Sequence, residues 1–251
     1  MKTHNFTIAG LDTDSIAFCK PDNSPFSEVE QQELLAELNS NFPEKIKWAH
    51  DGLFERFCVL KSKNYITHNK WSFKKGVYAL DPKSAYKKKG SSLKSSKLEP
   101  RVKDFMSEII KALIDNQTDQ LLSIYQSFIK EIHVLQDIKP WAKKATITEA
   151  VLNPGRSNEE NVLQAIEGLV GTQMGDKVYL YYSDELVEDS DSMFKLKLIE
   201  NWSNDHNPKL LCKRLYNTLE IFKNVIDITQ FPKYHLKGKK VREELRQLLE
   251  M

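Results

Sequence analysis

Hydrophobic and polar positions alternate differently in the two parts of this chain. Through about the first 100 residues, short apolar runs are separated by polar turn residues, a pattern typical of strands. Strands are expected near residues 5–10, 16–19, 46–49, 54–61 and 65–67. One helix is expected from residue 28 to about Asn39, because Ser27 and Glu30 have the spacing of a capping box. The pattern predicts mixed α and β structure for this part.

After residue 98 the period becomes helical. A stripe of apolar residues follows Pro100, which suits a first helical turn, and a second stripe follows Thr118. Further helices are expected at 159–170 and 208–225, with a strand at 177–182 and a turn at 153–155. The expected fold class is α+β, with a boundary near Leu98: residues 1–98 form a sheet-containing domain and residues 99–251 a mainly helical one with a few short strands.

Two acidic residues lie between the first two expected strands. Asp12 and Asp14 flank Thr13, so a hairpin here would gather negative charge at its tip. Hard carboxylate oxygens suit Mg²⁺, which takes one or two protein carboxylates and leaves other positions to water and phosphate. An ordinary polar turn is the alternative, since Asp, Thr and Ser all favour turns. A calcium loop is excluded because Ala17 and Asn23 stand where it needs Gly and Glu.

A strongly basic segment follows. Between Lys61 and Lys103 the chain has thirteen Lys or Arg and two acidic residues, a local charge of +11 in a chain of net charge +2, so the remainder carries about −9. Such asymmetry is typical of a surface that binds a polyanion, where clustered cations gain from counterion release. Gly90 would allow close backbone approach. The alternative is a solvated Lys-rich face or loop. Aromatic residues are interleaved with the cations: Tyr65, Trp71, Phe73, Tyr78 and Tyr86.

Other features limit the function classes. The longest apolar runs are too short for a membrane span, and no basic-then-apolar leader is present, so neither membrane insertion nor secretion is expected. Cys19, Cys58 and Cys212 are far apart, which fits reduced thiols in the cytoplasm and argues against structural zinc. The histidines lack ligand spacing, and no nucleophile-elbow signature occurs.

These residues together resemble the family B DNA polymerases. Asp12-Thr13-Asp14-Ser15 is similar to the family's palm motif Y-G-D-T-D-S, although Gly10 and Leu11 replace its Tyr and Gly. The run 61–66 resembles the K-K-R-Y element that touches the primer-template duplex; Lys63 and Tyr65 match it, and Ser62 and Asn64 depart from it. Three later stretches resemble the thumb and its entry, in the family's order: 88–90 with 99–100, 141–148 and 175–182.

Two family motifs do not occur in the 251 residues: the earlier palm motif D-x-x-S-L-Y-P and the fingers motif K-x-x-x-N-S-x-Y-G. The resemblance therefore implies the carboxy-terminal part of a polymerase, of a split viral or phage type or else a truncated fragment. Residues 1–98 would be the end of the palm with its hairpin and basic connector, and 99–251 the thumb. A second polypeptide would carry the missing palm, the fingers, the third metal-binding carboxylate and any exonuclease parts. A phage enzyme would work in the bacterial host cytoplasm.

The resemblance also implies residue roles. Asp12 and Asp14 would be catalytic and hold two Mg²⁺ ions, with Asp14 the direct ligand; Thr13 and Ser15 would contact the incoming dNTP. Primer-template DNA would be bound by Lys61, Lys63, Tyr65, Lys88, Lys89, Lys94 and Arg101. Two other interpretations stay open: a non-catalytic duplex-DNA-binding accessory protein, and a basic interaction protein unrelated to polymerases.

Overall fold

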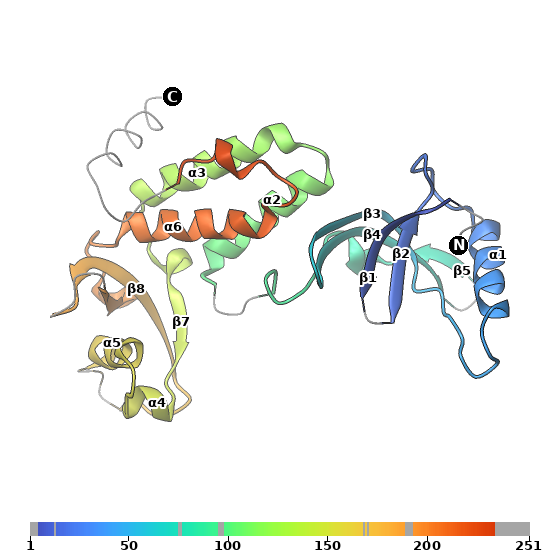
Figure 1. Ribbon diagram of the computed structural model, residues 1–251. Coiled ribbons are helices and arrows are strands. Elements are labelled where there is room, and N and C mark those ends of the chain that lie inside the picture. Colours follow the sequence, from blue (N-terminus) through green and yellow to red (C-terminus); the bar gives the residue numbers. More distant parts are fainter. Residues whose placement is uncertain are drawn as a thin grey trace. The chain divides into compact units, whose positions relative to one another are not determined.

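The computed structural model describes residues 5–12, 14–74, 77–94, 98–167, 169, 171–188 and 193–233. The chain divides into two compact units, which we call unit 1 (Met1–Lys94 with Leu113–Asn116) and unit 2 (Ser95–Ala112 with Gln117–Met251). Within the described residues the fold is α+β, with antiparallel sheets and six α-helices (Figure 1).

Unit 1 contains two antiparallel sheets and one helix. A two-stranded hairpin is formed by β1 (Thr7–Asp12) and β2 (Ser15–Cys19). It is followed by α1 (Glu28–Ser40). The second sheet has β3 (Leu53–Lys61) beside β4 (Asn64–Lys74), and the other edge of β4 pairs with β5 (Val77–Leu80) and β6 (Lys87–Lys89).

Local interactions account for the hairpin base and for α1. The predicted capping box is confirmed: Ser27 Oγ accepts from the Glu30 backbone, and Glu30 accepts from the Ser27 backbone at 2.7 Å. At the base of the hairpin, Phe6 stacks on Phe18 at 5.3 Å, and Phe26 meets both rings edge-on. The chain is thereby directed from the hairpin into α1.

The strand expected at residues 46–49 is wrong, because this segment is a loop. The backbone groups of Trp48 are bonded to a side chain instead of a neighbouring strand. Asn39 accepts from the Trp48 amide at 2.6 Å and donates to the Trp48 carbonyl at 3.1 Å. Ile46 is exposed. A four-residue apolar run could not reveal that an asparagine nine positions earlier replaces the partner strand.

Unit 2 begins with the helical pair that the sequence predicts. The helices are α2 (Pro100–Ile114) and α3 (Leu121–His133). A three-stranded antiparallel sheet follows, with β8 (Lys177–Leu186) between β7 (Lys143–Thr146) and β9 (Phe194–Leu198). The short helix α4 (Glu149–Leu152) and α5 (Ser157–Ile166) lie between β7 and β8, and α6 (Pro208–Leu219) follows β9.

The core of unit 2 lies among α2, α3 and α6 (Figure 1). Phe105 of α2 meets Phe128 of α3 edge-on at 5.1 Å, and both are almost fully buried. The buried carboxylate of Glu99, just before α2, forms a 2.9 Å ion pair with Arg214 of α6. A second apolar cluster covers the sheet and includes Ile147, Ile166 and Leu180. No helix in the described ranges has the length and apolar character needed to cross a membrane.

Candidate functional site

The tip of the β1–β2 hairpin contains the acidic residues singled out by the sequence. Asp12 pairs with Ser15, and Asp14 lies in the turn between the two strands. Asp14 and Ser15 are exposed. Thr13 and the side chain of Asp12 lie outside the described residues. A carboxylate at an exposed turn has the oxygen chemistry that Mg²⁺ prefers. Among the residues that the structure describes, no three His, Cys, Asp or Glu residues form a group that could hold a metal.

The hairpin contacts the β3–β4 sheet through a glycine. A Cβ added at Gly10 would lie 3.3 Å from Phe57 Cε1 and 3.5 Å from Val59 Cγ2, so the missing side chain lets the strand approach this sheet closely. Phe57 in turn stacks on Tyr65, with ring centroids 4.9 Å apart. One aromatic ring therefore connects the strand that leads to the acidic tip with the tyrosine of the basic segment.

The basic residues lie on two different faces of this sheet. Successive side chains of a strand point to opposite faces, and residues paired across two strands point to the same face. Tyr65 pairs with Lys89, and Thr67 pairs with both Phe57 and Lys87. We call the face that carries these residues the hairpin face, because Gly10 packs on Phe57 there.

The opposite face is different in character. Lys88 pairs with Ile66, which is completely buried. The neighbouring residue Tyr86 lies on the same side and stacks on His68 at 5.0 Å. The Tyr86 hydroxyl donates to Asp115, and partial burial together with this hydrogen bond raises the pKa of Tyr86. Of the three consecutive lysines, Lys87 and Lys89 thus lie on the hairpin face and Lys88 does not.

The β3–β4 turn is fixed by Asn64. Lys63 in this turn has a φ of 59°, in the left-handed region that non-glycine residues seldom adopt. Asn64 is only 5% exposed; its Nδ2 donates to the Ser62 carbonyl at 2.9 Å, and its Oδ1 accepts from the Ser92 amide at 3.1 Å. The side chain that departs from the family's K-K-R-Y element thus joins the turn to the segment after β6.

Gly90 makes that junction possible. Its φ is 105°, and an added Cβ would overlap Asn64 Oδ1 and the Lys63 carbonyl oxygen. The close backbone approach expected for this glycine is therefore made to the protein's own turn. The chain then turns back, with the Leu93 amide donating to the Gly90 carbonyl.

The other cations of the predicted DNA-binding set occupy varied positions. Lys61, Lys63 and Lys94 are exposed. Arg101, in contrast, is engaged inside unit 2: its guanidinium donates to both carboxylate oxygens of Glu131 at 2.5–3.0 Å and lies 4.3 Å from the ring centroid of Phe128. These hydrogen bonds raise the pKa of Arg101. Its charge is largely offset within the protein.

Lys87 is a candidate DNA-binding residue that the sequence motifs did not single out. It is exposed on the hairpin face, two positions before Lys89. In a strand, successive side chains point to opposite faces, so a strand at this position would place Lys87 and Lys89 on one face and Lys88 on the other. The sequence gives no sign of a strand here, because three identical residues show no alternation of polar and apolar positions.

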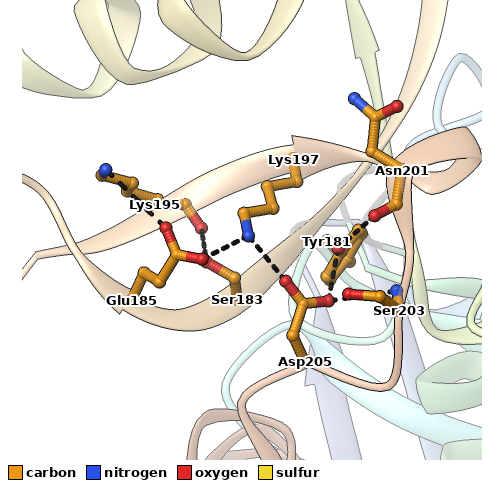
Figure 2. Close-up of polar contacts among 8 residues, drawn as sticks. All are labelled: Tyr181, Ser183, Glu185, Lys195, Lys197, Asn201, Ser203 and Asp205. Carbon is orange, nitrogen blue, oxygen red and sulfur yellow. Dashed lines mark hydrogen bonds and ion pairs between the residues drawn. The ribbon is translucent and has the colours of Figure 1, made fainter.

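Unit 2 contains a polar cluster on β8 and β9 whose charges compensate one another (Figure 2). Lys197 bridges Glu185 at 2.5 Å and Asp205 at 2.6 Å, and the Tyr181 hydroxyl donates to Asp205 at 2.7 Å. Burial of Asp205 would raise its pKa, but the hydrogen bonds from Lys197 and Tyr181 outweigh burial and lower it to about 2. Burial and the same hydrogen bond raise the pKa of Tyr181. This cluster supports the fold of unit 2.

Comparison with known proteins identified no relative: no family model matches the chain, and no curated protein matches it.

Proposed function

We propose that this chain is the C-terminal subunit or fragment of a family B DNA-directed DNA polymerase. It would supply catalytic aspartates and a duplex-gripping thumb, and it would extend primers only with a partner chain that carries the rest of the palm and the fingers. In this proposal unit 1 is the end of the palm with its basic connector, and unit 2 is the thumb.

The observation that carries the proposal is the packing of the hairpin on the sheet face that holds the exposed lysines. The strand that leads to Asp12 packs through Gly10 on Phe57, and Phe57 stacks on Tyr65. The same face carries Lys87 and Lys89. A strand that ends in acidic residues and packs on the same sheet face as exposed lysines and an aromatic ring suits an enzyme that must hold metal ions and a polyanion together.

The chemistry would be phosphoryl transfer, in which a primer 3′-hydroxyl attacks the α-phosphorus of a dNTP and pyrophosphate leaves. Mg²⁺ ions bound at the hairpin tip would supply charge stabilisation for the transfer. Asp14 and Asp12 would hold them, and the partner chain would provide the third carboxylate. Thr13 and Ser15 would lie beside the nucleotide.

The basic segment would position the duplex. Lys63 and Tyr65 would lie near the primer end, at the minor groove, where base edges differ little between sequences. The lysines of the hairpin face would bind phosphates, which fixes position without reading sequence. Arg101 contributes little to this surface, because Glu131 already engages its guanidinium.

The test compares the purified chain alone with the chain mixed with a partner. Alone, it should bind a primer-template duplex with steep salt dependence and incorporate no nucleotide. Adding a polypeptide that contains the missing palm and fingers motifs, sought first in neighbouring reading frames, should give Mg²⁺-dependent extension.

Three outcomes would contradict this proposal in different ways. Robust extension by the chain alone would overturn the shared active site. Normal extension by a reconstituted Asp14→Asn variant would favour the non-catalytic duplex-binding accessory protein. Failure to bind duplex DNA at moderate ionic strength would remove the support from the basic segment.

A further inference from the structure

The run Lys87-Lys88-Lys89 allows a sharper statement about which cations touch DNA. All three residues belong to β6, which pairs with the first residues of β4. Because side chains alternate along a strand, the three positive charges cannot all lie on one surface. The sequence alone treats them as equivalent.

Contacts on both sides of the sheet establish the alternation. On one side, Tyr86, just before β6, stacks on His68 of β4, and Lys88 pairs with buried Ile66. On the other side, Lys89 pairs with Tyr65, whose ring stacks on Phe57. The hairpin that ends at Asp12 approaches this second side through Gly10.

Exposure agrees with the division. Lys87 and Lys89 are exposed, whereas Lys88 is half-buried. A phosphate backbone that lies along the hairpin face would therefore meet two exposed lysine charges of this strand.

We propose that Lys87 and Lys89 bind consecutive parts of the phosphate backbone of a nucleic-acid duplex, and that Lys88 makes no phosphate contact. This inference rests on the proposed function, because it places the duplex on the side of the sheet where the acidic hairpin lies. It adds Lys87 to the binding surface and removes Lys88 from it.

The junction at Asn64 gives this surface a fixed end. The Asn64 side chain joins the turn that contains Lys63 to the segment directly after Lys89. Lys63 and Lys89 are thereby presented from two segments that cannot move independently. Preorganised cations lose less conformational freedom on binding than cations on separate loops do.

The experiment uses three matched variants of the full chain, Lys87→Met, Lys88→Met and Lys89→Met. Methionine keeps most of the apolar stem and removes only the charge, so the half-buried position 88 remains filled. Affinity for a fluorescently labelled primer-template duplex is measured by anisotropy at several KCl concentrations. The slope of log affinity against log salt should become flatter by about 0.9 for each phosphate that the variant no longer neutralises.

We expect this flattening for Lys87→Met and Lys89→Met and an unchanged slope for Lys88→Met; Lys87→Arg should keep the original slope. Circular dichroism and the thermal midpoint verify that each variant is folded. An equally flattened slope for Lys88→Met, or an unchanged slope for Lys87→Met, would overturn the assignment while the chain still binds duplex. Absence of salt-dependent binding by the unmodified chain would instead overturn the proposed function, and this inference with it.

Discussion

The two units differ in how they use apolar residues. In unit 2, the stripes of α2 and α3 close on a core that almost completely buries Phe105, Phe128 and Trp141. In the described part of unit 1, the completely or almost completely buried apolar side chains are Leu60, Ile66, Leu93 and Ile114. Unit 1 is held instead by stacked, half-buried aromatic rings and by backbone pairing. Leu11, next to the acidic tip, is 70% exposed. Unit 2 has the features of a stable support, and unit 1 keeps more of its residues available for contact.

The two units also differ in how their charged side chains are used. In unit 2, Arg101 is paired with Glu131, and Lys197 is paired with Glu185 and Asp205. Unit 1 also has ion pairs, Lys20 with Glu30 and Lys70 with Asp51, but Lys87 and Lys89 are exposed on β6. Paired charges support a fold, whereas an exposed cluster of one sign creates a field that acts on a partner. The comparison predicts that substitutions in unit 1 affect function first and those in unit 2 affect stability first.

The largest expected effect is that of Asp14→Asn on primer extension by the reconstituted enzyme. Under the proposed function Asp14 would hold a metal ion, so the substitution should lower the rate by about a thousandfold, because charge stabilisation in the transition state would be lost. Duplex affinity should change little. The rate is measured by gel-based extension at saturating dNTP.

Asp22→Asn is the matched control, since Asp22 lies in the exposed turn after β2 and is bonded only locally, to Ser24. It should extend primers normally. Near-normal extension by Asp14→Asn would show that the tip is an ordinary turn. Substitutions in unit 1 would then not affect function first, contrary to the prediction from the comparison of the two units.

Truncations of buried side chains test the predicted difference in stability between the two units. Phe105→Ala should lower the free energy of unfolding of unit 2 by about 3–5 kcal/mol, the usual cost of deleting a buried aromatic ring. Phe57→Ala in half-buried surroundings should cost unit 1 less, while it weakens extension by freeing Tyr65 and the hairpin. Hydrogen exchange followed by mass spectrometry reports on each unit separately. Equal costs in the two units would contradict the difference in packing.

Acid should act on unit 2 through Asp205. The pKa of this carboxyl is lowered to about 2 in the folded chain, below the value near 3.9 of an unfolded aspartate. Its ionised form therefore stabilises the fold above about pH 4, and this contribution is lost as the pH falls towards 2. Asp205→Asn should cost about 1–2 kcal/mol at pH 7 and little at pH 2.

The measurement is the urea midpoint as a function of pH. Glu200→Gln, an exposed change outside the network, should leave the profile unaltered. A pH-independent cost of Asp205→Asn would show that Lys197 and Tyr181 do not depend on the carboxylate charge.

The smallest expected effect concerns the β3–β4 turn. Lys63 adopts a left-handed φ, so Lys63→Gly should stabilise unit 1 by up to about 1 kcal/mol. The same change removes a cation and should weaken duplex binding. Lys61→Gly, at a neighbouring exposed strand position, should weaken binding without this stabilisation. Thermal midpoints and anisotropy separate the two effects.

Local patterns predicted much of the secondary structure. The capping box at Ser27, the apolar stripes after Pro100 and Thr118, and the alternation at 177–182 each depend on residues within a few positions of one another. The expected helices at 159–170 and 208–225 correspond to α5 and to α6 with the 3₁₀ turn after it. Helices with clear caps and one apolar face follow from short-range chemistry.

The parts that could not be predicted depend on distant residues. Arg101 belongs to the basic segment by sequence, but Glu131, thirty positions later, engages its guanidinium. The division of Lys87 from Lys88 needed the register of β6 on β4, which the local sequence does not contain. The role of Asn64 needed Gly90 and Ser92 to be brought beside it. Charge composition located the candidate surface. Only the pairing of the strands shows which lysines lie on which face of the sheet.

Asn64 also limits which substitutions this chain can accept during evolution. Its carboxamide lies against the Gly90 backbone and is almost fully buried, so the longer side chain of an arginine, which the K-K-R-Y element has at the corresponding place, would have to displace these contacts. Introducing arginine at position 64 alone should therefore disturb the turn more than it helps duplex binding. Asn64 and Gly90 are thus expected to be replaced together or not at all. Under the proposed function, a comparison made one position at a time would count this linked pair as a loss of the motif, although the two residues together build the turn.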